Sequence, residues 1–140
     1  MPSIRPDNLV RIAWAGEHRF DAGRPGGPHV RIDAAAETGP SPVDALLIGL
    51  GTCTGVDVVD ILAKRRTPVT AFNVEVQAER RETSPRRVQK AHLIYLIDGP
   101  GIERAQAERA VELAVTKYCS VRDSLDPAIS VTWSVVINGA

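Results

Sequence analysis

Two cysteines are the residues of this sequence best suited to chemistry. Cys53 lies among small residues in Gly51-Thr-Cys-Thr-Gly55, which leaves its sulfur approachable, and Cys119 lies in Lys117-Tyr-Cys-Ser-Val121. A cysteine acts as a nucleophile in its thiolate form. The two residues stand 66 positions apart (119 − 53), so only the fold can bring them together. Both can equally be small buried apolar residues, as free cysteines commonly are.

The composition excludes several classes of protein. The 140 residues include 17 basic and 17 acidic side chains, and the formal net charge is therefore zero. A general polyanion binder shows a marked basic excess, so we expect neither nucleic acid nor membrane as a partner. Residues 1–10 lack the apolar core of a signal peptide, and the apolar stretch 45–56 is too short to span a bilayer. These features predict a cytoplasmic protein whose thiols rest reduced.

Other chemical sites find little support in the sequence. The three histidines, His18, His29 and His92, have no metal-ligand spacing. The loop Gly23-Arg-Pro-Gly-Gly-Pro28 lacks the glycine pattern of a phosphate-binding loop. We therefore expect neither a metal nor a cofactor.

A long helix should carry the first cysteine. Ser41 is a suitable N-cap, Pro42 suits the first helical position, and Asp44 stands three residues after the cap. The helical pattern continues from Val43 to Arg66, and Pro68 prevents further extension.

Three glycines in this helix, Gly49, Gly51 and Gly55, each cost up to about 1 kcal/mol relative to alanine. Close approach of another backbone or a kink near Cys53 would account for them. The apolar face of the helix exceeds what a chain of this size easily covers, which predicts a second subunit.

The other elements follow from hydrophobic periodicity. Alternation predicts short strands at 9–14, 18–21 and 29–33, an antiparallel pair at 71–79 and 88–97, and a last strand at 129–138. Residues 102 to about 125 read as a second helix with Val111, Ala114, Val115 and Tyr118 on one face. We expect Trp14, Trp133 and Tyr95 to pack in the core. The order βββ-α-ββ-α-β predicts a single α+β domain over residues 1–140, with a mostly antiparallel sheet packed on two helices.

Two segments resemble the cysteine motifs of the OsmC/Ohr family, specifically its general OsmC-like branch. The first is Gly39-Pro-Ser-Pro-Val-Asp-Ala-Leu-Leu-Ile-Gly-Leu-Gly-Thr-Cys-Thr-Gly-Val-Asp57, and the second is Thr116-Lys-Tyr-Cys-Ser-Val121. The segment 68–99 also matches the hairpin of that family in length and pattern. The resemblance implies an OsmC-like fold and an intertwined homodimer whose active sites lie at the subunit interface.

The resemblance also implies a thiol-dependent peroxidase acting on organic hydroperoxides and hydrogen peroxide. Cys53 matches the cysteine that attacks the peroxide and becomes a sulfenic acid, and Cys119 matches the one that resolves it as a disulfide. A cellular dithiol then reduces the pair. An arginine from the N-terminal strands stabilises the thiolate in this family; Arg19 is our candidate and Arg24 the second choice.

In one position the sequence departs from the family pattern. The glutamate that holds the arginine lies ten residues before the cysteine, and that position here is Val43. Asp44 is the nearest acid, but it is one methylene shorter, lies about 100° around the helix, and also suits the helix cap. The departure keeps an alternative open, namely a non-catalytic or redox-sensing protein that binds an apolar small molecule at the dimer interface.

Overall fold

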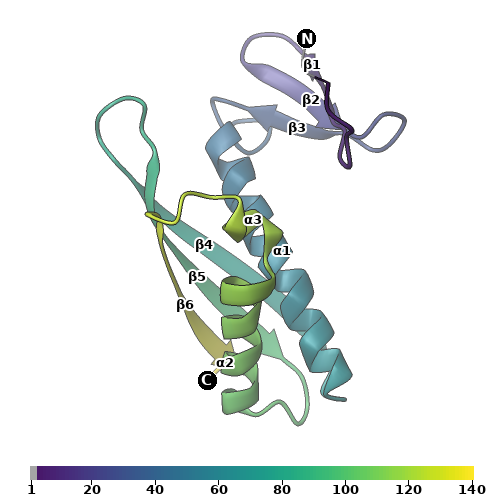
Figure 1. Ribbon diagram of the computed structural model, residues 1–140, viewed down its shortest axis with the longest axis vertical. Helices are drawn as coiled ribbons and strands as arrows, with labels where there is room; N and C mark the ends of the chain where they lie inside the picture. The colour runs from purple at the N-terminus through teal and green to yellow at the C-terminus, as the bar shows by residue number, and fades with distance from the viewer. Residues whose placement is uncertain (1–2) are drawn as a thin grey trace. The chain divides into compact units, whose positions relative to one another are not determined.

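The computed structural model describes residues 3–140 in two compact units. The N-terminal unit ends at Leu46, and the C-terminal unit begins at Leu47. We describe each unit by itself. Met1 and Pro2, the first residues of the segment inspected for a signal peptide, lie outside the described residues. The element order is β1β2β3-α1-β4β5-α2-η1-α3-β6 (Figure 1), and the predicted α+β class is confirmed.

The N-terminal unit contains an antiparallel sheet of β1 (Arg11–Trp14), β2 (Arg19–Gly23) and β3 (Val30–Asp33). Its register pairs Trp14 with Phe20, and Phe20 with Ile32. One face is therefore apolar and carries Ile12, Trp14, Phe20, Ala22, Val30 and Ile32. The opposite face carries arginine and aspartate side chains. Trp14 is 69% exposed, so the prediction that it packs in the core is wrong: its face of the sheet is uncovered.

Helix α1 (Pro42–Lys64) begins where the capping residues predict. The Ser41 hydroxyl oxygen accepts the Asp44 backbone N–H at 3.1 Å, and the Asp44 carboxylate accepts the Ser41 N–H at 2.9 Å. This reciprocal pair satisfies two amides at the start of the helix. The predicted capping role of Asp44 is confirmed.

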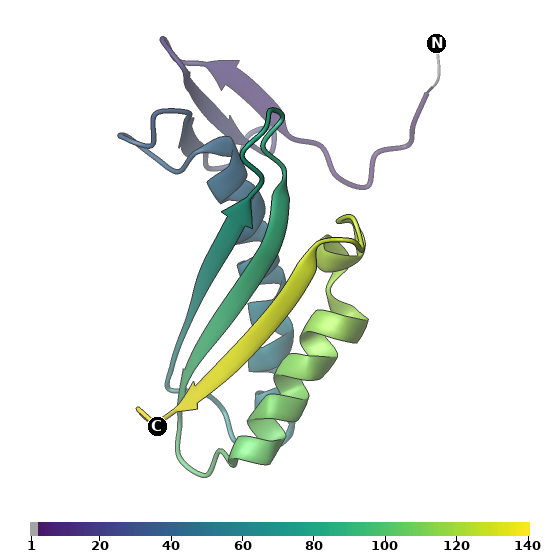
Figure 2. The ribbon, with the colours of Figure 1, turned by 90° about the vertical axis from the view of Figure 1, so that its left-hand side faces the viewer.

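The C-terminal unit is built on β4 (Ala71–Arg80), β5 (Val88–Asp98) and β6 (Ser130–Ile137). β4 and β5 form the predicted antiparallel hairpin, and β6 pairs with β5 in parallel. Helices α1 and α2 (Arg104–Leu113) lie on one face of this sheet (Figure 1), and Figure 2 shows the other face without a helix.

Two helix glycines let α1 approach β4 closely. A Cβ atom on Gly51 would lie 3.0 Å from Val76 Cγ2, and one on Gly55 would lie 3.2 Å from Phe72 Cε1. Both separations are tighter than ordinary packing contacts, so a larger residue would force strand or helix to shift. Close approach to the sheet therefore explains these glycines, and α1 continues through Cys53 as one helix.

The second predicted helix is interrupted. α2 ends at Leu113 and a π-helical turn, η1 (Ala114–Tyr118), follows; Cys119 is extended, with φ −74° and ψ 109°, before the short helix α3 (Ser120–Asp123). Val111, Ala114 and Val115 are buried as predicted, but Tyr118 is half exposed. The wider turn changes the direction of each following side chain, which removes Tyr118 from the buried face.

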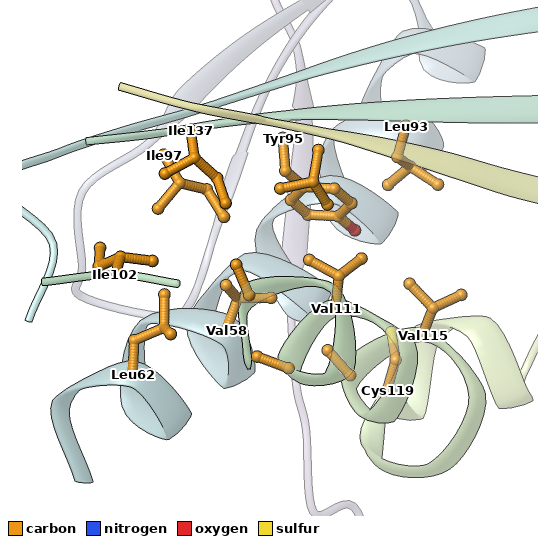
Figure 3. Packing of buried hydrophobic residues seen from close by; sticks show 14 of the residues in the cluster. Val58, Leu62, Leu93, Tyr95, Ile97, Ile102, Val111, Val115, Cys119 and Ile137 are labelled. Atoms are coloured by element: carbon orange, nitrogen blue, oxygen red, sulfur yellow. The ribbon is translucent and has the colours of Figure 1, made fainter. Parts of the chain in front are cut away.

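The core of the C-terminal unit lies between the sheet and the helices. Val58 and Leu62 of α1 meet the inward side chains of β5 and α2 (Figure 3), and Leu50 belongs to the same cluster. Tyr95 is fully buried and Trp133 packs against the cluster, as predicted. By length and composition, α1 is also long and apolar enough to cross a membrane. The apolar stretch 45–56, considered in the sequence analysis, is shorter and did not indicate this. In this fold, α1 packs its apolar side chains against the β4–β5–β6 sheet.

Candidate active site

The C-terminal unit brings the two cysteines together. Both are free thiols: Cys119 belongs to the core cluster, and Cys53 packs against that cluster, close enough to raise the pKa of the Cys119 thiol. Cys53 is half-buried at the edge of the core cluster, whereas Cys119 is buried inside it (Figure 3). A pair of adjacent thiols with unequal access to solvent is suited to disulfide chemistry.

Helix α1 places Cys53 through the residue one turn earlier. Gly49 and Cys53 are four residues apart and so lie on the same helix face. A Cβ on Gly49 would lie 4.0 Å from Val121 Cγ1 of α3, so this face of α1 lies next to the chain that follows Cys119. A large side chain at position 49 would separate α1 from α3 and the two thiols with them.

The turn η1 places Cys119. The Cys119 backbone N–H donates to the carbonyl oxygen of Ala114 at 3.0 Å, the five-residue spacing of a π-helix. Cys119 then leaves the helix in an extended conformation and caps α3, where its Sγ accepts the Arg122 backbone N–H at 3.2 Å. Backbone hydrogen bonds therefore fix Cys119 at both its main chain and its sulfur.

Burial governs the protonation of Cys119. Removal from water raises the pKa of the Cys119 thiol, and the neighbouring Cys53 raises it further. The Arg122 amide acts in the opposite direction because it stabilises the thiolate. Burial is the largest of these effects, so Cys119 rests as a thiol at neutral pH.

A buried tyrosine lies beside the cysteine pair. The Tyr95 hydroxyl donates to Thr54 Oγ1 at 2.7 Å, and Thr54 Oγ1 donates to the Leu50 carbonyl at 3.0 Å. Burial raises the pKa of Tyr95 to about 12, and a thiolate at Cys119 would raise it as well. Tyr95 therefore stays neutral and joins α1 to β5 next to Cys53.

An open pocket of about 390 Å³ adjoins Cys119. Trp133, Val131 and Leu125 supply apolar walls, and Lys117 and Arg122 supply charge. The Arg122 guanidinium donates to the carbonyls of Asp126 and Ile129, at 3.2 and 2.9 Å, and so holds the loop before β6. Within residues 47–140, no hydrogen bond joins a cationic side chain to Cys53.

The predicted cation belongs to the N-terminal unit. Arg19 Nε lies 3.6 Å from Asp33 Oδ2, and its Nη2 lies 3.8 Å from Glu17 Oε2. Arg24, the second candidate, is exposed on the loop after β2. The catalytic roles of Arg19 and Asp44 stay predictions.

Comparison with known proteins identifies the relationship. The sequence profile of the family described as OsmC-like protein matches residues 35–134. The chain belongs to the OsmC-like family. It is 33% identical to protein YhfA of Escherichia coli K12 over 132 residues, which cover 94% of this chain and 98% of YhfA.

Solved structures share the fold of this chain. A crystal structure of a hypothetical protein from Aquifex aeolicus VF5 superposes with a TM-score of 0.82 at 28% identity, covering 96% of this chain and 99% of that one. The organic hydroperoxide resistance protein OhrB of Bacillus subtilis shares the fold at a TM-score of 0.62 and 16% identity, covering 92% and 98%. The family includes peroxidase-type enzymes, and its members are typically dimers.

Three residues that adjoin predicted site residues within their own unit were not anticipated. Thr54 and Tyr95 form a buried hydrogen bond between α1 and β5, and Asp33 pairs with Arg19. Among residues 3–140, no group of three or more histidine, cysteine, aspartate or glutamate side chains gathers as a metal site would need. Alternation in residues 18–21 and 29–33 was the only sequence signal that could have brought Arg19 and Asp33 to one face.

Proposed function

We propose that this protein is a thiol-dependent peroxidase that reduces organic hydroperoxides and hydrogen peroxide. One observation supports this most strongly: the fold brings two free cysteines, distant in sequence, into one packed cluster, where Cys53 raises the pKa of the Cys119 thiol. Membership of a family that includes peroxidase-type enzymes agrees with it.

The proposed reaction begins at Cys53. Its thiolate attacks one peroxide oxygen, the O–O bond breaks, and the leaving alkoxide takes a proton to depart as an alcohol. Cys53 is now a sulfenic acid. The Cys119 sulfur attacks the Cys53 sulfur, water leaves, and a Cys53–Cys119 disulfide forms. A cellular dithiol reduces this bond by thiol–disulfide exchange and is itself oxidised to a disulfide.

The difference in access between the cysteines supports these roles. Cys53 is half-buried, and small residues flank it on α1, so a peroxide can reach its sulfur. Cys119 is buried and its thiol pKa is raised, so it is the poorer first nucleophile. The Arg122 amide beside Cys119 stabilises the thiolate that must form when Cys119 attacks the sulfenic acid.

The proposal assigns Arg19 as the cation that stabilises the Cys53 thiolate. Cys53 lies about three turns inside α1, and the helix dipole acts mainly within the first turn. A positive side chain must therefore come from elsewhere. Arg19 is half-buried and already paired with an acid, whereas Arg24 is exposed. Its burial and its ion pair therefore favour Arg19 over Arg24.

We also propose that the protein is a homodimer in a reducing, cytoplasmic setting. The N-terminal sheet exposes an apolar face, and Ile48, Thr52 and Val56 form an exposed stripe along α1. A second copy would remove this apolar surface from water. Sedimentation equilibrium at micromolar concentration should give about 30 kDa for the 15.1 kDa chain. If the protein is a monomer in this experiment, its active site cannot lie at a subunit interface, and that part of the proposal is wrong.

Peroxide consumption with a dithiol reductant tests the proposal directly. The wild type should consume cumene hydroperoxide and hydrogen peroxide. Cys53→Ser should abolish turnover, because a serine hydroxyl forms no sulfenic acid. Cys119→Ser should react once and stall, and excess peroxide should then carry Cys53 to sulfinic and sulfonic acids that intact-mass spectrometry resolves.

A matched control is Thr52→Ser, which changes an exposed hydroxyl residue next to Cys53 without touching either thiol. It should turn over like the wild type. If wild-type protein treated with one equivalent of peroxide keeps both thiols free, the peroxidase function is wrong. The non-catalytic, ligand-binding alternative would then stand.

A further inference from the structure

We propose that the tip of the β4–β5 hairpin is a docking site for an acidic surface of the protein that reduces the Cys53–Cys119 disulfide. The hairpin tip is residues 80–87, with the sequence Arg-Arg-Glu-Thr-Ser-Pro-Arg-Arg. The inference rests on the proposed function, because it concerns the dithiol reductant of that same site.

The hairpin tip concentrates positive charge in a chain whose formal net charge is zero. It contains four arginines and one glutamate, which leaves three positive charges on the tip and three net negative charges on the rest of the chain. The loop extends beyond the strands that it joins (Figure 1), and Arg80, Arg86 and Arg87 are exposed. A partner that approaches this end of the C-terminal unit therefore meets a positive surface.

Backbone carbonyls hold three of these arginines in place. Arg80 Nε donates to the Arg86 carbonyl oxygen at 2.8 Å, and Arg86 Nε donates to the Arg81 carbonyl oxygen at 3.2 Å. Arg81 Nε donates to the Pro85 carbonyl oxygen at 2.7 Å. Each bond crosses from one arm of the hairpin to the other, and each uses a single N–H of the five that a guanidinium carries.

The outer nitrogens of these three guanidinium groups are available to a ligand. Among residues 3–140, Nη1 and Nη2 of Arg80, Arg81 and Arg86 make neither a hydrogen bond nor an ion pair with an acid. Nη1 and Nη2 form a planar fork, which binds a carboxylate through two parallel hydrogen bonds. Because Nε already fixes each fork, binding costs little side-chain entropy.

The surroundings of the hairpin tip favour a short acidic segment of a protein over a nucleic acid. The charged residues of β4 that precede the tip, Glu75 and Glu79, are acidic and exposed. Lys90 of β5 lies 3.8 Å from Glu79, so its charge is compensated. A nucleic acid needs a continuous basic track for its phosphates, and here the uncompensated positive charge ends with the tip.

Ion-pair and backbone contacts join the hairpin tip to the pocket beside Cys119. Arg87 Nη2 lies 2.8 Å from Asp126 Oδ2, and the Asp126 carbonyl oxygen accepts Arg122 Nη1 at 3.2 Å. The Arg122 backbone N–H donates to Cys119 Sγ at 3.2 Å. Arg122 and Pro127, on either side of Asp126, line the pocket. A protein seated on the tip would therefore adjoin the pocket that Cys119 lines.

Thiol–disulfide exchange in this pocket completes the reduction. Cys119 lines the pocket, so a thiolate of the donor attacks Cys119 Sγ, the Cys53–Cys119 bond breaks, and Cys53 leaves as a thiolate. The donor and Cys119 then share a mixed disulfide. The second thiolate of the donor attacks the donor sulfur of this bond, and Cys119 leaves as a thiolate that takes a proton from water. The donor is oxidised to a disulfide, and its two electrons have reduced the cysteine pair.

The test compares three peptide dithiols of equal length as reductants. Each peptide carries two cysteines beside a run of glutamates, serines or lysines, and diamide forms the Cys53–Cys119 disulfide without a peroxide. Rates are divided by those of the same peptides toward hydroxyethyl disulfide, because neighbouring charges alter the reactivity of a thiol.

At low salt, the glutamate peptide should reduce the wild type about tenfold faster than the serine peptide, and the lysine peptide should be the slowest, because opposite charges steer association. At about 1 M NaCl the Debye length falls to about 3 Å, so the three rates should converge. If the lysine peptide is as fast as the glutamate peptide at low salt, the docking site is wrong.

A triple variant of the hairpin tip, Arg80→Gln with Arg81→Gln and Arg86→Gln, should lose the preference for the glutamate peptide. Its reduction by dithiothreitol should stay at the wild-type rate. The matched control removes three arginines of the same unit outside the hairpin: Arg65→Gln, Arg66→Gln and Arg109→Gln. The control should keep the preference, and an equal loss in both triple variants would show that total charge acts instead of the tip. If the tip variant does not fold, the comparison of peptides on the wild type still decides.

The outcomes separate this inference from the proposed function. If the wild type consumes peroxide with dithiothreitol but shows no preference among the peptides, the docking site is wrong and the peroxidase stands. If it consumes no peroxide, yet the glutamate peptide is preferred on the diamide-formed disulfide, the peroxidase is wrong and the docking site stands. Fluorescence anisotropy at physiological salt tests the other class of partner. If a single-stranded oligonucleotide binds more tightly than the glutamate peptide, and the tip variant loses that binding, the inference is overturned.

Discussion

Oxidation of the cysteine pair should stabilise this protein substantially. A Cys53–Cys119 disulfide would close a loop of 66 residues (119 − 53). In the chain-entropy treatment, a cross-link of that span raises the free energy of unfolding by about 4 kcal/mol. A chain of 140 residues has an unfolding entropy near 0.3 kcal/mol/K, so the midpoint of thermal unfolding should rise by about 10 to 15 °C.

This stabilisation can be measured by calorimetry on protein reduced with a dithiol and on protein treated with one equivalent of hydroperoxide. Both samples must have the same protein concentration, because dimer dissociation would couple to unfolding. Cys119→Ser is the control: peroxide should leave its midpoint nearly unchanged. Peptide mapping of the oxidised wild type should show the Cys53–Cys119 link.

The result that would refute the reasoning is a linked pair without stabilisation. The estimate assumes that the native fold already holds the two sulfurs where the bond forms, so that no distortion offsets the entropy. If the linked peptide is present and the midpoint rises by less than about 2 °C, the fold must distort to close the bond. The contact between the thiols would then be incidental.

Three further predictions concern single groups. In reduced protein, iodoacetamide should modify Cys53 before Cys119. Because burial raises the pKa of the Cys119 thiol, the alkylation rate of Cys119 should rise only at a pH above the ordinary thiol pKa. Equal rates for the two cysteines in peptide mapping would contradict this. Tyr95→Phe should lower the unfolding free energy by about 1 kcal/mol in denaturant titrations. In a Thr54→Val background the same substitution should cost less, because the Tyr95–Thr54 hydrogen bond is already absent there. The pKa of Asp33 is lowered from 3.8 to about 2 by the Thr38 and Ala35 hydrogen bonds, so its stabilising contribution is present above pH 4 and lost as pH falls toward 2. Acid unfolding of Asp33→Asn should lack that component, and identical acid profiles would show that the charge contributes nothing.

Much of the fold could be predicted from local patterns. Strands β4, β5 and β6 alternate between more and less buried side chains over most of their length, and the Ser41–Asp44 cap marks the start of α1. Both signals depend on neighbours in sequence, so the sequence alone carries them. The break at Ala114–Tyr118 could not be predicted. The apolar pattern continues through it, and the segment contains neither glycine nor proline, the two residues that break an α-helix most strongly.

The site was predictable only in part. The cysteines stand out by type and by family resemblance. The Arg19–Asp33 ion pair of the N-terminal unit does not, because it depends on which residue of β2 Asp33 faces. A shift of the β2–β3 register by one residue would place Asp33 on the apolar face instead. Tyr95 and Thr54 are likewise 41 positions apart, and only the packing of α1 on β5 joins them.

Because of the wide turn η1, the number of residues before Cys119 determines the direction in which Cys119 points. A π-turn contains one residue more than the α-helical turn it replaces, and an α-helix advances about 100° for each residue. Deleting one residue between Ala114 and Tyr118 would restore a regular helix and rotate Cys119 by about that angle, away from Cys53. Substitutions at the exposed Thr116 and Lys117 leave the backbone path unchanged. In this segment an insertion or deletion would therefore disconnect the thiols, whereas a change of side chain would not.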